Sequence, residues 1–213
     1  MVKTVARVIT VDGPAGVGKG TLAQRLAAHL GWSYLDSGAY YRLLAWAGAG
    51  NEAEAIDLLA RLSVEFRPGP EGMECWVDGR PAAIRSEAVA AAASQLAASG
   101  PLRAALTEKF RSLAAVGDLV ADGRDMGTVV FPTAFLKIYL TASAEVRAQR
   151  RLNQLQDSAK NININKLVDE IRQRDERDST RSIAPLKPAS DAVVIDTSSL
   201  SREQVFQQVL RLI

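Results

Sequence analysis

The chain has 213 residues, 47% of them hydrophobic and 23% charged, and its formal net charge is +2 at pH 7. This composition supports a hydrophobic core and excludes a disordered chain, and the nearly balanced charge gives no general attraction to nucleic acid or anionic membranes. No apolar stretch is long enough to span a bilayer, and no signal-peptide pattern is present. The single cysteine, Cys75, excludes an internal disulfide framework, so we expect a cytoplasmic protein with no nucleic-acid and no membrane partner.

A glycine-rich segment lies between the first predicted strand, Arg7–Val11, and the first predicted helix, Lys19–Leu30. In this context glycines let successive backbone N–H groups converge on an anion, and the helix start adds the positive end of its dipole. Lys19 has the offset needed to reach β- and γ-phosphates, which a turn that only links strand to helix would not require. The predicted phosphate-binding residues are Gly13, Pro14, Ala15, Gly16, Val17, Gly18, Lys19, Gly20 and Thr21.

The segment departs from the common phosphate-loop pattern at one position. A serine or threonine that binds Mg²⁺ usually follows the lysine, but here Gly20 follows it and the hydroxyl comes one place later, on Thr21. The sequence leaves two alternatives for the metal: Thr21 contacts it, or phosphates and waters supply most of its ligands.

Short apolar runs alternate with helical patterns along most of the chain. The predicted strands are Arg7–Val11, Trp32–Leu35, Asp118–Ala121, Leu136–Leu140 and Ala192–Ile195. The predicted helices are Lys19–Leu30, Ala39–Ala47, Glu87–Ala98, Leu102–Ala115, Ala144–Leu155, Lys166–Arg174 and Arg202–Leu212. This alternation predicts an α/β fold with a parallel sheet flanked by helices, which binds ligands beyond the carboxyl ends of its strands.

Two segments interrupt this rhythm. Residues 63–86 contain short alternating runs separated by Pro-Gly-Pro and Asp-Gly turn signals, which predicts a small β-rich insertion. The polar stretch Ser158–Asn165 separates two arginine-bearing helices, and it is either a mobile flap or a plain surface loop.

Polar residues follow the second and third of these strands. In the first group, Ser37 is placed to cap the helix that follows, and Arg42 one turn later makes an anion site the alternative. In the second, Asp122–Thr128 places two aspartates and an arginine around glycines, which favours a ligand site over a self-paired turn.

Arginine-rich segments occur on two predicted helices. Arg174, Asp178 and Arg181 are spaced to share one helical face, and such a run is usually a solvated face of ion pairs. Arg147, Arg150 and Arg151 form a similar patch on the preceding helix. The only histidine, His29, has no metal-binding pattern near it and is predicted to be structural.

Four segments together resemble the bacterial cytidylate kinase family. They are Gly13–Thr21, Asp36–Ala39 with Tyr41-Arg42, Asp122–Pro132 (DGRDMGTVVFP), and Arg174–Arg181 with Ala184–Leu186. The third is highly specific to that family, whereas the glycine loop alone would indicate only a P-loop kinase or NTPase. The resemblance runs almost from end to end and includes the β-rich piece.

The resemblance implies a P-loop kinase core with a five-stranded parallel sheet in a single monomeric unit, residues 1–213. The implied parts are a core at about 1–37 and 116–213, an acceptor-nucleotide region at about 38–115 containing the insertion, and a short lid at about 152–166. It also implies transfer of the γ-phosphoryl group of ATP to CMP or dCMP with Mg²⁺, and a role in pyrimidine metabolism.

The family's functional residues map onto matching positions of this chain. Gly13–Thr21 would hold ATP, and Lys19, Arg151 and Arg181 would assist the transfer. The acceptor's phosphate would be held by Ser37, Arg42 and Arg124. The cytosine would be read by Ser94, Arg103, Asp125 and Arg181. The ribose would be contacted by Arg174 and Asp178.

The physical chemistry of cytosine agrees with this assignment. A carboxylate such as Asp125 accepts a hydrogen bond from the N4 amino group, and arginines donate to N3 and O2. Uracil has an oxygen in place of that amino group, and an unpaired polar group in a site rejects an analogue by up to ~10⁴-fold. We therefore expect discrimination against UMP.

Two other classes of function share parts of the pattern. A related kinase for UMP, shikimate or dephospho-coenzyme A would have the same loop and sheet, but DGRDMGT and the arginine-rich helix argue against it. A nucleotide-dependent switch such as a GTPase needs Asp-x-x-Gly after a strand and Asn-Lys-x-Asp, and neither spacing occurs.

Overall fold

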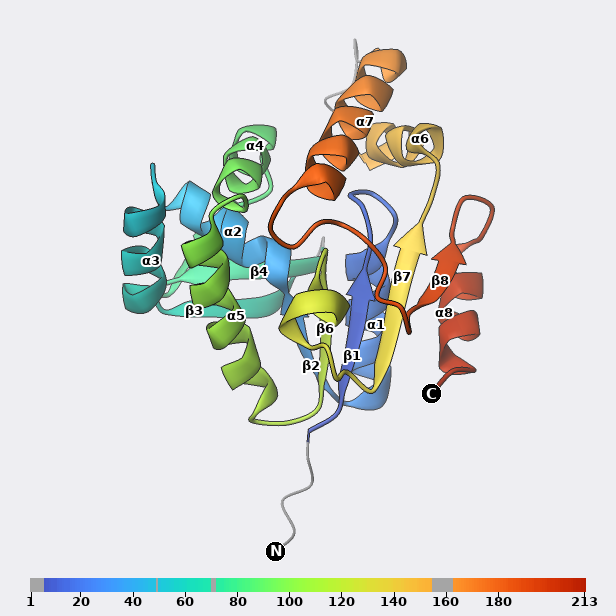
Figure 1. Ribbon diagram of the computed structural model, residues 1–213, viewed down its shortest axis with the longest axis horizontal. Helices are drawn as coiled ribbons and strands as arrows, with labels where there is room; N and C mark the ends of the chain where they lie inside the picture. Colours follow the sequence, from blue (N-terminus) through green and yellow to red (C-terminus); the bar gives the residue numbers. More distant parts are fainter. Residues whose placement is uncertain (1–5, 49, 70–71, 155–162) are drawn as a thin grey trace, which may run out of the picture. The chain divides into compact units, whose positions relative to one another are not determined.

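The computed structural model describes residues 6–48, 50–69, 72–154 and 163–213 (Figure 1). The described residues form two compact units, one within 1–35 and 111–213 and the other within 36–110. Among the described helices, none combines the length and the apolar character that a bilayer crossing requires.

A five-stranded parallel sheet organises the first unit and confirms the predicted α/β class. Its order is β2-β6-β1-β7-β8, with β1 between β6 and β7 and hydrogen-bonded in parallel to both. Each strand lies within two residues of its predicted bounds. They are β1 (Val8–Asp12), β2 (Ser33–Asp36), β6 (Leu119–Gly123), β7 (Leu136–Thr141) and β8 (Val193–Asp196).

Helices α1 (Lys19–Leu30) and α8 (Arg202–Leu210) cover one face of this sheet. Leu22 and Leu26 of α1 and Phe206 of α8 pack with Ile9 and Val11 of β1 in one buried cluster. Helix α1 ends where Gly31 adopts a left-handed conformation, and α8 begins with a capping box formed by Ser201 and Gln204. His29 packs edge-on against Phe206, in agreement with a structural role.

The opposite face of β1 carries a short π-helix, η1 (Met126–Val130), that the sequence pattern did not predict. Its N–H groups bond to carbonyls five residues earlier, from Val130 to Asp125 at 3.2 Å and from Phe131 to Met126 at 2.7 Å. The side chain of Arg111 donates to the carbonyls of Val129 and Val130 at the end of the turn. π-Helical turns are rare in proteins, and those that occur are often found at functional sites.

Helices α6 (Ala144–Gln154) and α7 (Ile164–Thr180) pack together and follow β7 at its carboxyl end (Figure 1). Helix α7 is longer at both ends than the predicted Lys166–Arg174, and Asn163 caps its start. The predicted flap was therefore wrong at Ile164 and Asn165, which are helical. Residues 155–162, within the predicted lid, lie outside the described part.

The second unit contains the predicted β-rich insertion as a three-stranded antiparallel sheet. Its strands are β3 (Val64–Gly69), β4 (Gly72–Val77) and β5 (Arg80–Ala82), paired in that order. A two-residue turn joins the last two strands, and both of its residues, Asp78 and Gly79, have positive φ, as an Asp-Gly hairpin turn requires.

Helices α2 (Ser37–Trp46), α3 (Glu52–Arg61), α4 (Glu87–Leu96) and α5 (Gly100–Ala114) complete the order of elements there. The ring of Tyr40 contacts those of Phe66 and Phe110, which joins α2, β3 and α5. Helix α3 was missed by the sequence analysis, although its start carries a clear signal, because Asn51 caps Glu54.

Candidate active site

The phosphate loop predicted from Gly13–Thr21 connects β1 directly to α1. Three of its glycines, Gly13, Gly16 and Gly18, have positive φ values of 145°, 81° and 98°. A Cβ atom on Gly13 would lie 2.2 Å from the carbonyl oxygen of Leu140, so only glycine fits where the loop leaves the sheet. The sequence context and the observed geometry agree on an anion-binding loop.

Lys19 stands at the first position of α1, and its side chain turns back over the loop. The residue is 8% exposed, and its ammonium group donates to the carbonyl oxygen of Pro14 at 2.7 Å. A lysine held across a glycine-rich loop places its positive charge where the loop's N–H groups converge. This is the position that the motif predicts for binding a phosphate group.

Two arginines of α6 brace the loop from outside. Arg147 is buried, donates to the carbonyls of Ala15 at 3.2 Å and Ala142 at 3.0 Å, and forms an ion pair with Asp175 of α7. Arg150 donates to the hydroxyl of Thr197 at 3.0 Å and to its carbonyl at 2.5 Å. Arg147 is therefore an internal support and not part of a surface patch, whereas Arg150 stays partly exposed and lines the neighbouring cavity.

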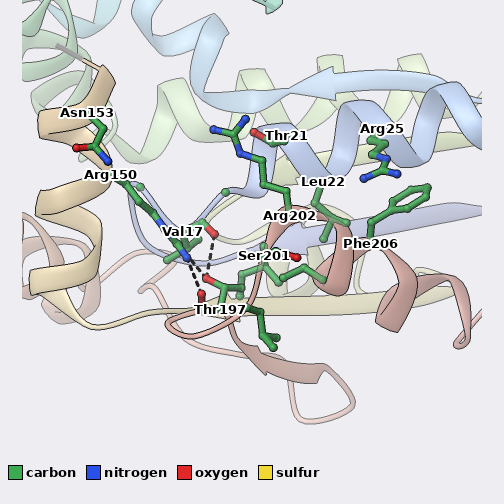
Figure 2. A pocket seen from close by; sticks show the side chains of 15 residues that line it. Val17, Thr21, Leu22, Arg25, Arg150, Asn153, Thr197, Ser201, Arg202 and Phe206 are labelled. Atoms are coloured by element: carbon green, nitrogen blue, oxygen red, sulfur yellow. Dashed lines mark hydrogen bonds between the residues drawn. The ribbon is translucent and has the colours of Figure 1, made fainter. Parts of the chain in front are cut away.

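Thr197, which follows β8, connects Arg150 to the phosphate loop. Its hydroxyl lies 3.2 Å from the carbonyl oxygen of Val17 (Figure 2). The same hydroxyl lies 3.1 Å from the carbonyl oxygen of Thr141. Arg151, the third arginine, is partly buried on α6.

A cavity of about 440 Å³ lies beside the loop. It is lined by the loop, by α1, by α6 and by the segment from β8 into α8. Figure 2 shows Arg150 and Asn153 from α6 on one side and Arg202 and Phe206 from α8 on another. A mixed apolar and cationic cavity of this size next to an anion-binding loop suits the base and sugar of a nucleotide.

Gly20 lies beside a carboxylate and a hydroxyl group that come from two strands of the sheet. A Cβ atom on Gly20 would lie 3.4 Å from Oδ2 of Asp122 and 3.6 Å from the hydroxyl of Tyr34, whereas Thr21 is exposed and lines the cavity. Tyr34 donates to the same Asp122 oxygen at 2.7 Å. The described residues contain no cluster of three or more His, Cys, Asp or Glu side chains suited to a metal.

These donors fit a hydrated Mg²⁺ better than a metal held in a protein cage. Mg²⁺ gives up its water reluctantly and is usually held by one or two carboxylates together with substrate phosphates. Within the described part of the chain, Asp122 supplies the carboxylate that lies within 4 Å of a Cβ atom at Gly20, and it would be the protein ligand of the metal.

The segment after β6 meets the end of α7. Arg124 donates through Nε to Oδ2 of Asp178 at 3.1 Å, and Asp178 is 7% exposed. Arg181 lies 3.9 Å from the other oxygen of Asp178 and donates to the carbonyl of Ala184 at 2.8 Å. The alternative of a solvated ion-paired face is therefore wrong for Asp178.

Arg181 also differs from the predicted single helical face. Helix α7 ends at Thr180, and Arg181 has extended backbone dihedrals, so its side chain is placed by the turn and not by helical spacing. Arg174 is partly buried on α7.

Asp125 precedes η1 and is 4% exposed. Its backbone carbonyl accepts the N–H groups of Val129 and Val130, but its side chain does not cap the turn. The N–H groups at the start of η1 are taken instead by Asp12, at the end of β1: Met126 donates to Oδ1 at 2.9 Å and Gly127 to Oδ2 at 2.7 Å.

Burial raises the pKa of Asp12 from 3.8 to about 6, against the opposing effect of its two backbone hydrogen bonds. Asp125 raises this pKa further, and the charge of Lys19 lowers it.

In the second unit, the predicted phosphate-binding group lies at the start of α2. Ser37 was predicted as the cap, but Asp36 caps the helix by accepting from Ala39 N–H at 2.8 Å, and the buried Ser37 is the first helical residue. Arg42, one turn later, donates to the other oxygen of Asp36 at 2.9 Å.

The predicted cytosine-reading residues of this unit lie on α4 and α5. Arg103 is buried, donates to the carbonyl of Ala97 at 3.0 Å and lies 5.7 Å above the ring of Tyr41. Ser94 is partly buried on α4, which packs against α2.

A family model described as Cytidylate kinase matches residues 9–213. The chain belongs to the cytidylate kinase family. A cytidylate kinase of Shewanella denitrificans is 50% identical over 95% of this chain and 94% of its own, and one of Stutzerimonas stutzeri is 50% identical over 99% and 96%. A solved gluconokinase from Sinorhizobium meliloti shares the fold, with a TM-score of 0.50 and 15% identity over 98% of this chain and 92% of that one.

In this member of the cytidylate kinase family, three residues support the predicted site through hydrogen bonds and were not predicted from the sequence. Asp12, directly after the first predicted strand, was assigned no role, and neither were Tyr34 and Thr197. A signal existed for Asp12, because an aspartate closing a buried strand just before the loop must find partners. Tyr34 and Thr197 find theirs 88 and 180 residues away, which no local pattern reveals.

Proposed function

We propose that this chain transfers the γ-phosphoryl group of ATP to CMP or dCMP, giving ADP and CDP or dCDP. The register of the central strands carries the proposal. Asp12 of β1 pairs with Gly123 of β6, so the phosphate loop and the Arg124-Asp125 segment leave the sheet at the same level and the same edge. The proposed ATP-binding loop and the charged segment proposed to bind the acceptor therefore belong to the same unit.

ATP is the proposed donor. Its phosphates would be bound by the N–H groups of Gly13–Thr21 and by Lys19, and its base and ribose would occupy the neighbouring cavity. The cavity opens onto Gly16 and Gly18 of the loop, so both parts of one nucleotide can be held at once. Mg²⁺, when bound, would supply a positive charge that compensates the charge developing on the transferred group.

The acceptor would be bound by the residues that match the motifs of the family. Arg124 and Arg42 are each paired with a carboxylate of their own unit, Asp178 and Asp36, which keeps both guanidinium groups oriented. An acceptor phosphate would compete for these donors and gain bidentate hydrogen bonds. We assign the phosphate to Ser37, Arg42 and Arg124, the cytosine to Ser94, Arg103, Asp125 and Arg181, and the ribose to Arg174 and Asp178.

The transfer itself needs little covalent chemistry from the protein. Two phosphates must lie in line, and positive groups must face the charge that develops between them. Lys19, Arg151 and Arg181 are the proposed donors of that charge. Closure of the site around both nucleotides would exclude water, which would otherwise hydrolyse ATP.

A coupled assay for ADP formation tests the function directly. We expect rapid turnover with CMP and dCMP, much slower turnover with UMP and AMP, and little ADP without an acceptor. A preference for UMP or for dephospho-coenzyme A would replace this proposal with a related kinase activity. Acceptor-independent turnover would indicate a nucleotide-dependent switch.

The contact between Tyr34 and Asp122 makes a second prediction. Tyr34→Phe keeps the ring but removes the hydroxyl that orients the carboxylate, so the Mg²⁺ concentration for half-maximal activity should rise by about threefold to tenfold, the scale of one ordinary hydrogen bond. Titration of MgCl₂ at saturating ATP and CMP measures this value. An unchanged midpoint, with intact folding, would remove Asp122 from the proposed metal site.

A further inference from the structure

The carboxylate of Asp12 joins the strand that carries the phosphate loop to the segment that carries the proposed acceptor-binding residues. Asp12 is 5% exposed and uses both oxygens, one for the N–H of Met126 at 2.9 Å and the other for that of Gly127 at 2.7 Å. These are the first two residues of η1. The two partners lie more than a hundred residues apart in the sequence, so this is a tertiary contact.

The start of η1 packs closely against β1 at this contact. A Cβ atom on Gly127 would lie 2.9 Å from the hydroxyl of Thr10, 3.2 Å from the side chain of Lys137 and 3.3 Å from Oδ2 of Asp12. The backbone of η1 is therefore seated directly against β1. Because Arg124 and Asp125 immediately precede this turn, the direction in which they leave the sheet depends on how its first residues are held.

Keeping a charged carboxylate in this place opposes stability. Its pKa is raised to about 6, so above that pH the folded protein holds an ion that burial disfavours, even after two hydrogen bonds. The neighbouring charges are mixed: Lys19 from α1 favours the ion, and Asp125 disfavours it. Asp12 also disfavours ionisation of Tyr139, its partner on β7. Holding this charge in a buried place costs stability, and stability is commonly sacrificed at functional positions.

We propose that Asp12 is a positioning residue for acceptor recognition, which fixes the start of η1 so that Arg124 and Asp125 are directed to the acceptor next to the phosphate loop. The inference rests on the proposed function. Asp12 itself contacts neither nucleotide. It acts through the two backbone N–H groups, and the backbone of β1 stays paired with β6 and β7 whatever its side chain.

Asp12→Asn is the decisive variant, because it keeps the shape but removes the charge and one of the two acceptor oxygens. Thr10→Val is the matched control, since Thr10 lies two residues earlier on the same face of β1 and is fully buried, and its hydroxyl finds no hydrogen-bond partner among the described residues. For both variants and the wild type, steady-state kinetics would give kcat and the KM values for CMP and ATP. Calorimetry would give CMP affinity, and thermal melting at pH 7.5 would give Tm.

For Asp12→Asn we expect kcat/KM for CMP and the affinity for CMP to fall by ~10- to 100-fold, the scale of one hydrogen bond to a charged acceptor. The KM for ATP should change by less than about twofold. The Tm should change little, because relief of the buried charge and the loss of an acceptor for one buried N–H group oppose each other. Thr10→Val should leave all kinetic values unchanged.

Three results would overturn the inference. An equal rise in both KM values would assign Asp12 to the phosphate loop alone, and a lower Tm or failure to fold would make its role structural. Unchanged CMP kinetics would leave it without a role in recognition. Failure of the proposed function itself would be recognised separately, because the wild type would then neither bind nor phosphorylate CMP.

Discussion

Lys19→Met is expected to lower kcat for CMP phosphorylation by ~10²-fold or more, because it removes a charge aimed at the group in transfer. Methionine retains the length and the apolar stem of the buried lysine, so the start of α1 should remain packed. The ammonium group contacts the loop carbonyl of Pro14 at 2.7 Å, and its loss removes one charge-assisted hydrogen bond from the folded loop. Initial rates at saturating ATP and CMP measure the effect.

Lys187→Met is the matched control for that variant. Lys187 is exposed, lies in the segment after α7, and loses the same charge when substituted. We expect near-normal turnover from the control and a Tm close to that of the wild type for both variants. Near-normal turnover by Lys19→Met would remove the phosphate loop from the mechanism.

The local parts of the site were predictable because their sequence signals are local. The phosphate loop needs glycines at particular backbone positions, and the observed positive φ values at Gly13, Gly16 and Gly18 are the physical reason for the pattern. The predicted helix Lys19–Leu30 has the same bounds as α1. Its leucine spacing and the glycine at its C-terminal end are both local signals, so they can be recognised in the sequence. The parallel sheet followed from apolar runs buried on both faces.

The parts that were missed depend on contacts that periodicity does not encode. The η1 sequence, Met-Gly-Thr-Val-Val, reads as a strand or loop, and it forms a π-turn because Asp12 and Arg111 bind its two ends. Such a turn has no 3.6-residue period to detect. Helix α3 was different, since the capping signal of Asn51 is local and is present in the sequence.

The arginine-rich segments show why charge patterns alone mislead. From sequence, an alternating run predicts a solvated helix face, yet Asp178 is buried because its partner Arg124 comes from the end of a distant strand. Arg147 is drawn inward by two backbone carbonyls and Asp175. Whether a charge is solvated depends on what the fold places opposite it, which is a tertiary property.

Asp125→Ala is expected to lower kcat/KM for CMP by ~10²- to 10³-fold and to narrow the preference for CMP over UMP, because a site that loses its hydrogen-bonding group can no longer reject the analogue that lacks the matching donor. The N4 amino group of cytosine would lose its acceptor, whereas the O4 of uracil would lose a repelling partner. The KM for ATP should stay within about twofold of the wild type. Kinetics with CMP and UMP on the same preparation measure both effects.

The side chain of Asp125 can be removed without dismantling the turn that follows it. Its backbone carbonyl, which alanine retains, accepts the N–H groups of Val129 and Val130, and Asp12 holds the start of η1 independently. Asp169→Ala, at an exposed position of α7, controls for the loss of one negative charge. Equal losses with CMP and UMP, together with a raised KM for ATP, would make Asp125 a structural residue and leave the choice of base to Arg103, Ser94 and Arg181.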